Sequence, residues 1–270
     1  MTETPSSMTY SSVVSRDSVR VALTIAALND LQVKAGDIQN AYLTAPCKEK
    51  ITVTCGPEFG EDEGKTAEIV RALYGLKSSG AAYGEHLANC MTHLGYQTCL
   101  ADNDVWFMAQ VKPDGTEYYA YVLIYVDDIL VIHHDAKMVL GQIDYFFHMK
   151  PESMGDPDIY LGCKLRLHIV EETQVYAWLQ SPSKYIQEAV KNAETYYEKT
   201  YRSKFSAKVR SPFATGYRPE MDITKELNAD EASYYQSQIG VLRWIVEIGR
   251  VDIITEVSLL ASSKKRSRPF

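Results

Sequence analysis

The chain has 270 residues, 46% of them hydrophobic and 23% charged, with a formal net charge of -7. This composition excludes an intrinsically disordered chain and allows a sizeable core in one or two globular domains. The negative charge argues mildly against nucleic-acid binding, although acidic metal ligands lower the sum without removing a local basic groove.

The first residues and the cysteines indicate a soluble intracellular protein. The start, MTETPSSMTYSS, does not form a signal peptide, and no apolar run is long enough to cross a bilayer. The five cysteines form no CxxC pair and are odd in number, which favours a reducing compartment. The basic run KKRSR at 264–268 is better explained as a solvated tail than as a localisation or phosphate-binding signal.

Strands and helices are mixed from residue 1 to about residue 180. Helices are predicted over 17–29, over 80–94 with an end at Gly95, and from about Asp135. Strands are predicted over 31–37, 50–55, 104–110, 117–126, from Asp128, over 158–170 and over 175–179. The turn signals KPDG and EETQ make hairpins of the strands that flank them.

Residues 181–270 are mainly helical by prediction. Their helical segments are 183–201, 231–249 and 252–262. The expected fold class is therefore α+β, with a mixed domain over 1–180 followed by a smaller helical domain over 181–270.

The run YVLIYVDDILVIHH at 121–134 places two carboxylates, Asp127 and Asp128, among strand-forming apolar residues. A lone ionised carboxylate is costly to bury, so these acids should lie at a tight turn or beside a positive charge. The run contains no Lys or Arg, which makes a metal ion a candidate for that charge. Because Asp-Asp is also a common turn pair, the two residues alone do not decide between a turn and a metal site.

A third carboxylate, Asp37, ends the predicted strand LQVKAGD. Acids at the ends of two adjacent strands can converge on two divalent ions about 3.5 to 4 Å apart, which clamp the attacking and leaving oxygens of a phosphoryl displacement. Hard oxygen ligands select Mg²⁺ or Mn²⁺ over zinc. The pattern predicts nucleotidyl transfer, in which one ion activates a 3′-hydroxyl and the other holds a triphosphate.

Several segments, in order along the chain, resemble the boxes of one polymerase family. Residues 125–128 resemble the YxDD box of reverse transcriptases, and DIQNAYL at 37–43 resembles their first catalytic box. RALYGLKSSGAAYGEHL at 71–87 and YLGCKL at 160–165 resemble the LYGLKQSPRQW box and the primer-contacting hairpin of copia-type (pseudoviral) retrotransposon reverse transcriptases. The segments 183–190 and 233–262 resemble the thumb and the connection of that family.

The resemblance implies an RNA-directed DNA polymerase with a right-hand fold: a palm, made of an antiparallel sheet with helices, and partial fingers over 1–180, then a helical thumb over 181–270. It implies that Asp37, Asp127 and Asp128 are catalytic and bind two Mg²⁺ or Mn²⁺ ions. The implied partners are an RNA or DNA primer–template and deoxynucleoside triphosphates, with no membrane. The implied location is the cytoplasm, within a virus-like particle, or the nucleus.

The resemblance also implies roles for other residues of the boxes. Tyr42 would lie beside the incoming sugar and exclude a ribonucleotide 2′-hydroxyl, whereas spacing alone favours a core tyrosine. The other implied nucleotide-binding residues are Ile38, Lys77 and Tyr125. The implied template and primer contacts are Gly75, Ser79, Gly80, Tyr160, Leu161 and Gly162, the last of which would let the hairpin approach the primer backbone.

The chain departs from the family pattern at Ser79–Ala82, where SGAA replaces SPRQ and removes a basic and an amide side chain. It also begins after the basic fingers strand of the family and ends before an RNase H domain, which predicts a truncated enzyme with weak primer–template affinity. Two alternatives stay open. One is a catalytically silent remnant that binds nucleic acid or protein, and the other is a palm-type two-metal enzyme such as a nucleotidyl cyclase, which needs no primer.

Other clusters have simpler explanations. His86, Cys90 and His93 share one face of the helix at 80–94, with Cys99 shortly after, so a zinc site can be imagined, but Cys90 is better explained as a small packed residue. His133 and His134 are expected to face solvent. The tyrosines of TYYEKTYR at 195–202 are better explained by a helix face than by stacking on bases. The sequence contains no GxxxxGK phosphate loop.

Overall fold

The computed structural model describes residues 11–171, 175–205, 213 and 226–262. The KKRSR run and most of the predicted EETQ turn lie outside these residues. The internal contacts divide the chain into two units. One unit contains residues 1–158 and 167–178, and the other contains residues 159–166 and 179–270.

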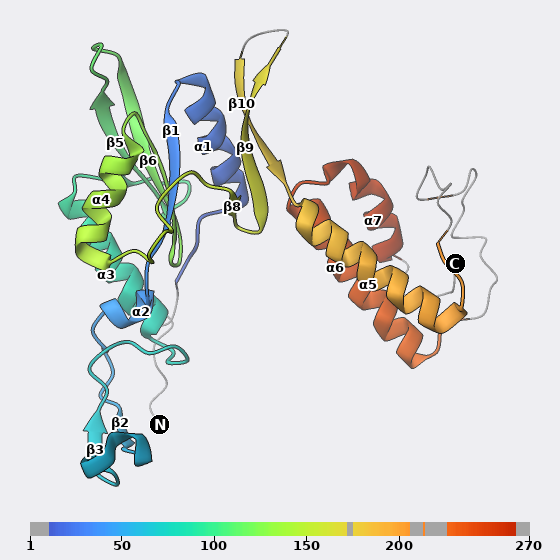
Figure 1. Ribbon diagram of the computed structural model, residues 1–270, viewed down its shortest axis with the longest axis horizontal. Coiled ribbons are helices and arrows are strands. Elements are labelled where there is room, and N and C mark those ends of the chain that lie inside the picture. Colours follow the sequence, from blue (N-terminus) through green and yellow to red (C-terminus); the bar gives the residue numbers. More distant parts are fainter. Residues whose placement is uncertain (1–10, 172–174, 206–212, 214–225, 263–270) are drawn as a thin grey trace. The chain divides into compact units, whose positions relative to one another are not determined.

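The first unit is built on a five-stranded antiparallel sheet with the strand order β1-β7-β6-β5-β4 (Figure 1). Its strands are β1 (Gln32–Asp37), β4 (Gln97–Thr98), β5 (Val105–Val111), β6 (Glu117–Tyr125) and β7 (Asp128–His133). The hairpin of β5 and β6 is confirmed, and Gly115 takes a positive φ of 89° in its turn. All residues of β7 after Asp128 are buried, so this strand lies in the core of the unit.

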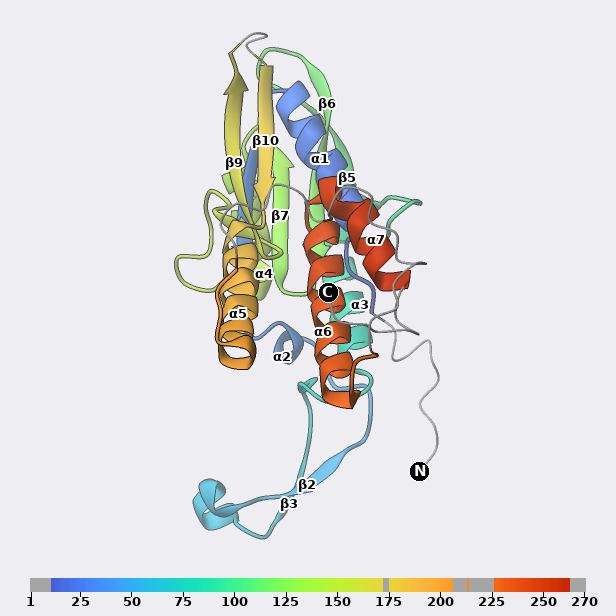
Figure 2. The same ribbon diagram turned by 90° about the vertical axis from the view of Figure 1, so that its right-hand side faces the viewer.

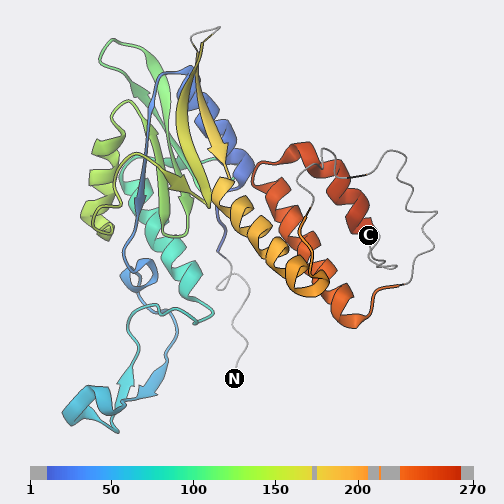
Figure 3. The same cartoon turned by 45° about the vertical axis from the view of Figure 1, so that its right-hand side comes forward.

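Helices cover both faces of this sheet (Figure 3). The helix α1 (Arg16–Leu28) lies on one face, and α4 (Ala136–Phe147) lies on the other beside α3 (Ser79–His93). Both α1 and α4 contact β1 and β7. Each of these two helices begins at a side-chain cap, because Ser15 Oγ and Asp135 Oδ1 accept hydrogen bonds from main-chain amides of the first turn. The predicted end of α3 is confirmed, since Gly95 has a φ of 89°.

Four short elements of the first unit lie between β1 and α3. The helix α2 (Ala41–Thr44) follows β1 directly. The strands β2 (Thr52–Thr54) and β3 (Thr66–Glu68) pair as an antiparallel hairpin around a 3-10 helix, η2 (Pro57–Asp62), and Figure 2 shows this hairpin away from the main sheet. Of these elements the sequence predicted β2 alone.

The single strand predicted over 158–170 is wrong, because two strands occupy it, but a hairpin is present at 160–165, where the family resemblance implies one. The structure has β8 (Ile159–Tyr160), β9 (Cys163–Val170) and β10 (Val175–Ser181) in a sheet with the order β10-β9-β8. Leu161 and Gly162 have positive φ angles of 48° and 79°, and Tyr160 pairs with Cys163 across them. A two-residue turn with both φ angles positive matches the twist of antiparallel strands, so the chain reverses here.

The helices of the second unit confirm the predicted ones. They are α5 (Ser183–Tyr201), α6 (Ala229–Glu247), the 3-10 helix η4 (Val251–Ile253) and α7 (Ile254–Ser262). Asn228 and Glu231 form a capping box at the start of α6. No residue of α5 is fully buried, and its contact with α6 includes a ring stack between Tyr196 and Tyr234, with centroids 3.4 Å apart.

The mixed fold with antiparallel sheets is therefore as predicted, and the assignment of palm, fingers and thumb stays a prediction. All five cysteines are free. Within the described ranges, no helix combines the length and the apolar character needed to span a membrane.

Candidate active site at the end of β1 and β7

The three predicted carboxylates converge at one end of the five-stranded sheet. Asp37 and Asp128 are paired residues at the shared end of β1 and β7. Asp127 lies in the turn between β6 and β7, where Tyr125 pairs with Asp128, and its carbonyl accepts a hydrogen bond of 2.9 Å from the amide of Ile38. The predicted convergence of the strand ends is confirmed, and the metal-binding and catalytic roles of the acids stay predictions.

The turn that carries the acids is strained. Its two central residues are Val126 and Asp127, and Val126 has a φ of 57°. A left-handed conformation is unfavourable for a β-branched residue, because its branched Cβ crowds the backbone. Tyr83 of α3 donates a hydrogen bond of 3.0 Å from its hydroxyl to the carbonyl of Val126. This buried tyrosine therefore anchors the turn to α3.

The acids have a positively charged partner that the sequence argument missed. The Nζ atom of Lys150 lies 2.6 Å from Asp37 Oδ2 and 3.8 Å from Asp127 Oδ2. The run 121–134 contains no Lys or Arg, but Lys150 lies outside it and supplies one positive charge, so a metal ion is not the only candidate for balancing these carboxylates. Lys150 comes instead from the loop after α4.

Main-chain hydrogen bonds hold this loop against β1. The amide of Lys150 donates to the carbonyl of Asp37 at 2.7 Å, and the amide of Asp37 donates to Ser153 Oγ at 3.1 Å. Ala35 and Gly155 exchange two backbone hydrogen bonds of 2.8 and 3.0 Å. The main chain at Lys150 is thus fixed relative to Asp37, and only its side chain is free to move.

Burial and the crowding of like charges raise the proton affinity of Asp128 in the acid site. Burial, followed by the charges of Asp127 and Asp37, raises the pKa of Asp128 to about 6, and Lys150 acts in the opposite direction. The hydrogen bond to Asp37 raises the pKa of Lys150. Asp37 Oδ1 is buried without a hydrogen-bond partner in the described part of the chain. The site is therefore short of positive charge and of donors.

The donor set fits a hard divalent cation. Three carboxylates, one with an unpartnered buried oxygen, are the ligands that Mg²⁺ and Mn²⁺ prefer. In the described residues, however, no three His, Cys, Asp or Glu side chains already surround one metal position. Binding a metal would thus require the carboxylates to rotate and Lys150 to move away from Asp37.

An aromatic cluster lies close to the acids. Tyr42 is half-buried on α2, and its ring centroid is 4.6 Å from that of Tyr74 and 5.7 Å from that of Tyr83. Tyr83 connects this cluster to the acid turn through its hydrogen bond to the carbonyl of Val126. Burial and then the charge of Asp127 raise the pKa of the Tyr74 hydroxyl. Tyr74 belongs to the matched LYGLK segment and was not singled out from the sequence.

The remaining predicted residues of the first unit differ in exposure. The side chain of Ile38 is fully buried, and Ser79 is buried with its hydroxyl donating to the carbonyl of Leu73 at 2.6 Å. Neither side chain reaches the surface. Lys77 is exposed, Tyr125 is half-buried, and Gly75 has a φ of 97° with no atom within 4 Å of an added Cβ.

Gly80 and residues 160–162 are the remaining predicted template or primer contacts. A Cβ at Gly80 would lie 3.1 Å from Ser11 Cβ, so this glycine allows a close approach of two segments. Tyr160, in the second unit, is buried, and Leu161 and Gly162 form the turn that follows it.

The imagined zinc site is not assembled. The ring of His86 packs edge-on against Phe147 at 5.2 Å, and that of His93 packs against Phe146 at 5.7 Å. Cys90 is buried, and burial raises the pKa of its thiol to about 11. These contacts support aromatic and apolar packing.

The expectation that both His133 and His134 face solvent is wrong. His133 is 1% exposed, and its Nδ1 accepts a hydrogen bond of 2.8 Å from the amide of Asp135. Burial lowers the pKa of His133. His134 is half-buried, with Nδ1 2.6 Å from the hydroxyl of Tyr118.

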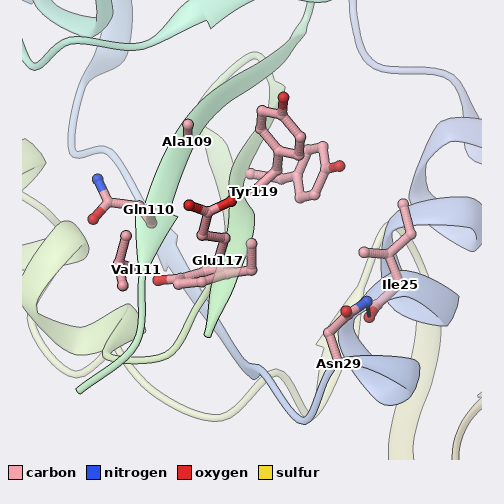
Figure 4. A pocket seen from close by; sticks show the side chains of 9 residues that line it. Ile25, Asn29, Ala109, Gln110, Val111, Glu117 and Tyr119 are labelled. Carbon is pink, nitrogen blue, oxygen red and sulfur yellow. Dashed lines mark hydrogen bonds between the residues drawn. The ribbon is translucent and has the colours of Figure 1, made fainter. Parts of the chain in front are cut away.

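Two cavities lie near the sheet of the first unit. One of about 550 Å³ is bordered by Ile25 of α1, by Asn29 just after that helix, and by Gln110, Glu117 and Tyr119 of the β5–β6 hairpin, and Figure 4 shows that it contains none of the predicted site residues. The other, of about 470 Å³, is lined in part by Tyr83, Trp106 and Val126. Only the second therefore adjoins the acid turn.

Known proteins with similar sequences include polyproteins of transposons. The chain is 26% identical over 266 residues to the retrovirus-related Pol polyprotein from transposon TNT 1-94 of Nicotiana tabacum, covering 93% of this chain and 18% of the relative. It is 25% identical over 138 residues to the Pol polyprotein from transposon RE1 of Arabidopsis thaliana, covering 50% of this chain and 9% of the relative. These polyproteins are thus much longer than the chain.

A shorter relative is the putative transposon Ty5-1 protein of Saccharomyces cerevisiae, which is 27% identical over 237 residues, covering 86% of this chain and 70% of the relative. The model of the family described as reverse transcriptase (RNA-dependent DNA polymerase) matches residues 4–202, which is more than half of the chain. The chain therefore belongs to the reverse transcriptase family, in its copia-type retrotransposon branch.

Proposed function

We propose that this chain is an RNA-directed DNA polymerase domain that transfers nucleotides to a primer 3′-hydroxyl. The observation that carries the proposal is the meeting of Asp37, Asp127 and Asp128 at one end of the sheet in a reverse transcriptase family member. In this proposal the first unit contains the palm, and the helices of the second unit form the thumb.

The three acids would hold two Mg²⁺ or Mn²⁺ ions, which activate the primer hydroxyl and stabilise the charge on the triphosphate. The role of the protein is to keep the acids in place. The paired strand ends hold Asp37 opposite Asp128, and the hydrogen bond from Tyr83 to Val126 fixes the turn that presents Asp127. Positioning of this kind lowers the barrier because the charges need not reorganise during the reaction.

The proposed substrates are an RNA or DNA primer–template and deoxynucleoside triphosphates, and the proposed location is the cytoplasm, in a virus-like particle, or the nucleus. The exposed Lys77 would contact the template or the nucleotide. Tyr42 would border the sugar of the incoming nucleotide, because its ring packs on Tyr74 next to the acids.

The acid assignment is tested by primer extension with Asp127→Asn. This substitution keeps the size of the side chain and removes its charge, so extension should fall at least a thousandfold while the melting temperature stays near that of the parent. Asp156→Asn is the matched control, because Asp156 is 86% exposed and pairs with Lys34 on the same sheet. Extension by the Asp127 variant at the parent rate would refute the acid assignment.

The same assay separates the two alternatives. Primer–template binding without extension in the parent would indicate a silent nucleic-acid-binding domain. Product formation without a primer would indicate a cyclase-like reaction.

The role of Tyr42 is tested by Tyr42→Ala. Removing the ring should open space beside the sugar and raise incorporation of ribonucleotides relative to deoxyribonucleotides by about tenfold or more. Tyr145→Ala, at an 81% exposed position on α4, is the control. An unchanged sugar preference in an active Tyr42 variant would exclude Tyr42 as the gate.

A further inference from the structure

The loop after α4 places one ammonium group inside the acid site. Lys150 Nζ lies between Asp37 Oδ2, at 2.6 Å, and Asp127 Oδ2, at 3.8 Å. We infer that Lys150 is a tethered counter-cation, which occupies the site when divalent ions are absent and competes with them for the same carboxylates. This inference rests on the proposed two-metal function.

The competition follows from the shared carboxylates of Asp37 and Asp127. An ion that bound both Asp37 and Asp127 would lie about 2.1 Å from a carboxylate oxygen of each, in the region that the ammonium now occupies. Two cations cannot share this small space without strong repulsion. Lys150 must therefore swing out before a divalent ion settles between these two acids.

The loop geometry allows this exchange. The amide of Lys150 is hydrogen-bonded to the carbonyl of Asp37, which fixes the start of the side chain, while the flexible stem of a lysine lets the ammonium move. The ion pair is partly solvated, since the side chain of Lys150 is 45% exposed and that of Asp37 is 28% exposed. Solvated ion pairs are weak, so a doubly charged ion can replace the ammonium.

The same contact has a second consequence in the metal-free protein. Three carboxylates held together repel one another, and Lys150 offsets part of that repulsion. A variant without the ammonium should therefore bind divalent ions more tightly but be less stable when no divalent ion is present. A lysine with a purely structural role would give lower stability without tighter metal binding.

The test uses the full chain and Mn²⁺ as the probe, without nucleotide. In Lys150→Met the dissociation constant for Mn²⁺, measured by electron paramagnetic resonance of the free ion, should fall about tenfold relative to the parent. Its melting temperature in EDTA should drop by several degrees, and Mn²⁺ should restore it. Lys150→Arg keeps the charge and should behave like the parent.

Lys34→Met is the matched control, because Lys34 on β1 pairs with Asp156 at 2.7 Å. This variant should lose a similar ion pair without changing the affinity for Mn²⁺. Asp127→Asn should weaken Mn²⁺ binding and so show that the measured ion occupies the acid site.

The possible outcomes distinguish the counter-cation role of Lys150 from the proposed metal site. If the parent binds Mn²⁺ and Lys150→Met binds it equally or more weakly, the counter-cation role is wrong and the metal site stands. If neither protein binds Mn²⁺, the metal site and the counter-cation role are both wrong. Tighter binding by Lys150→Met in a chain that never extends a primer would support the exchange and count against the polymerase proposal alone.

Discussion

Two tight turns of this chain each have a positive φ at the first central residue, and they are stabilised in different ways. The acid turn joins β6 to β7 through Val126 and Asp127, and the second turn joins β8 to β9 through Leu161 and Gly162. In both turns the first central residue is apolar and has a positive φ, 57° at Val126 and 48° at Leu161. L-residues avoid this region because their Cβ approaches the backbone too closely.

The turns differ in what stabilises them. At the second turn Gly162 takes a φ of 79°, and no atom lies within 4 Å of an added Cβ, so glycine supplies one of the two positive φ angles without strain. The acid turn has no glycine, and its conformation is held from outside by Tyr83, Ile38 and the pairing of Asp128 with Asp37. Tertiary contacts thus compensate for unfavourable local geometry where the position of carboxylates matters.

Among the variants that test the difference between the two turns, Tyr83→Phe should lose the most stability. This change removes the donor to the carbonyl of Val126 and leaves a part-buried acceptor without that partner, which typically costs about 1 to 3 kcal/mol. Chemical denaturation should show this loss of stability. If the acid turn is catalytic, primer extension should fall more than stability predicts, because Asp127 would lose its fixed position.

Tyr145→Phe supplies the control for this variant, since Tyr145 is 81% exposed. The same denaturation measurement should find it within about 0.5 kcal/mol of the parent, as is usual for surface changes. Equal stability of the Tyr83 and Tyr145 variants would mean that the hydroxyl of Tyr83 does not support the acid turn.

The convergence of the acids was predictable because it depends on local patterns. Asp37 ends an alternating strand, and Asp127 and Asp128 interrupt an apolar run at a point where a hairpin must turn. Pairing of β1 with β7 then brings the three together. Lys150 was not predictable, because its contact with Asp37 joins residues 113 positions apart and no local pattern distinguishes this lysine from a surface one.

At two other places the prediction and the structure differ, because a longer sequence pattern there outweighs a local signal. Leu161–Gly162 lies inside a long strand-like pattern, which favours one continuous strand. Gly162 is the local signal for the chain reversal that the structure has there. The polar side chain of His133 predicts exposure, yet His133 is the last residue of the buried strand β7. Burial is tolerated there because the amide of Asp135 satisfies one ring nitrogen.

The second turn should be sensitive to the residue at Gly162. In Gly162→Ala the added Cβ meets no neighbour but must adopt a φ of 79°, which costs about 1 to 2 kcal/mol. Denaturation should report this loss, and Gly155→Ala should not, because Gly155 also has open space and lacks a positive φ. Identical stabilities of the two alanine variants would show that the turn relaxes without cost.

Val126→Gly should cause the smallest change in stability, and this change should be a gain. Glycine removes the left-handed penalty of about 1 to 2 kcal/mol but adds backbone entropy of roughly 0.5 to 1 kcal/mol in the unfolded chain. The net result is a gain in stability of up to about 1.5 kcal/mol, measurable as a higher denaturation midpoint. Nucleotidyl transfer should nevertheless decline, because a glycine turn holds Asp127 less rigidly.

This pairing of higher stability with lower activity is the result expected of strain kept for function. Val126→Ala serves as the control, since alanine shortens the side chain and still resists the positive φ. A Val126→Gly variant that is both more stable and as active as the parent would show that the strain at Val126 has no role in presenting Asp127. The acid turn would then differ from the Leu161–Gly162 turn in sequence alone.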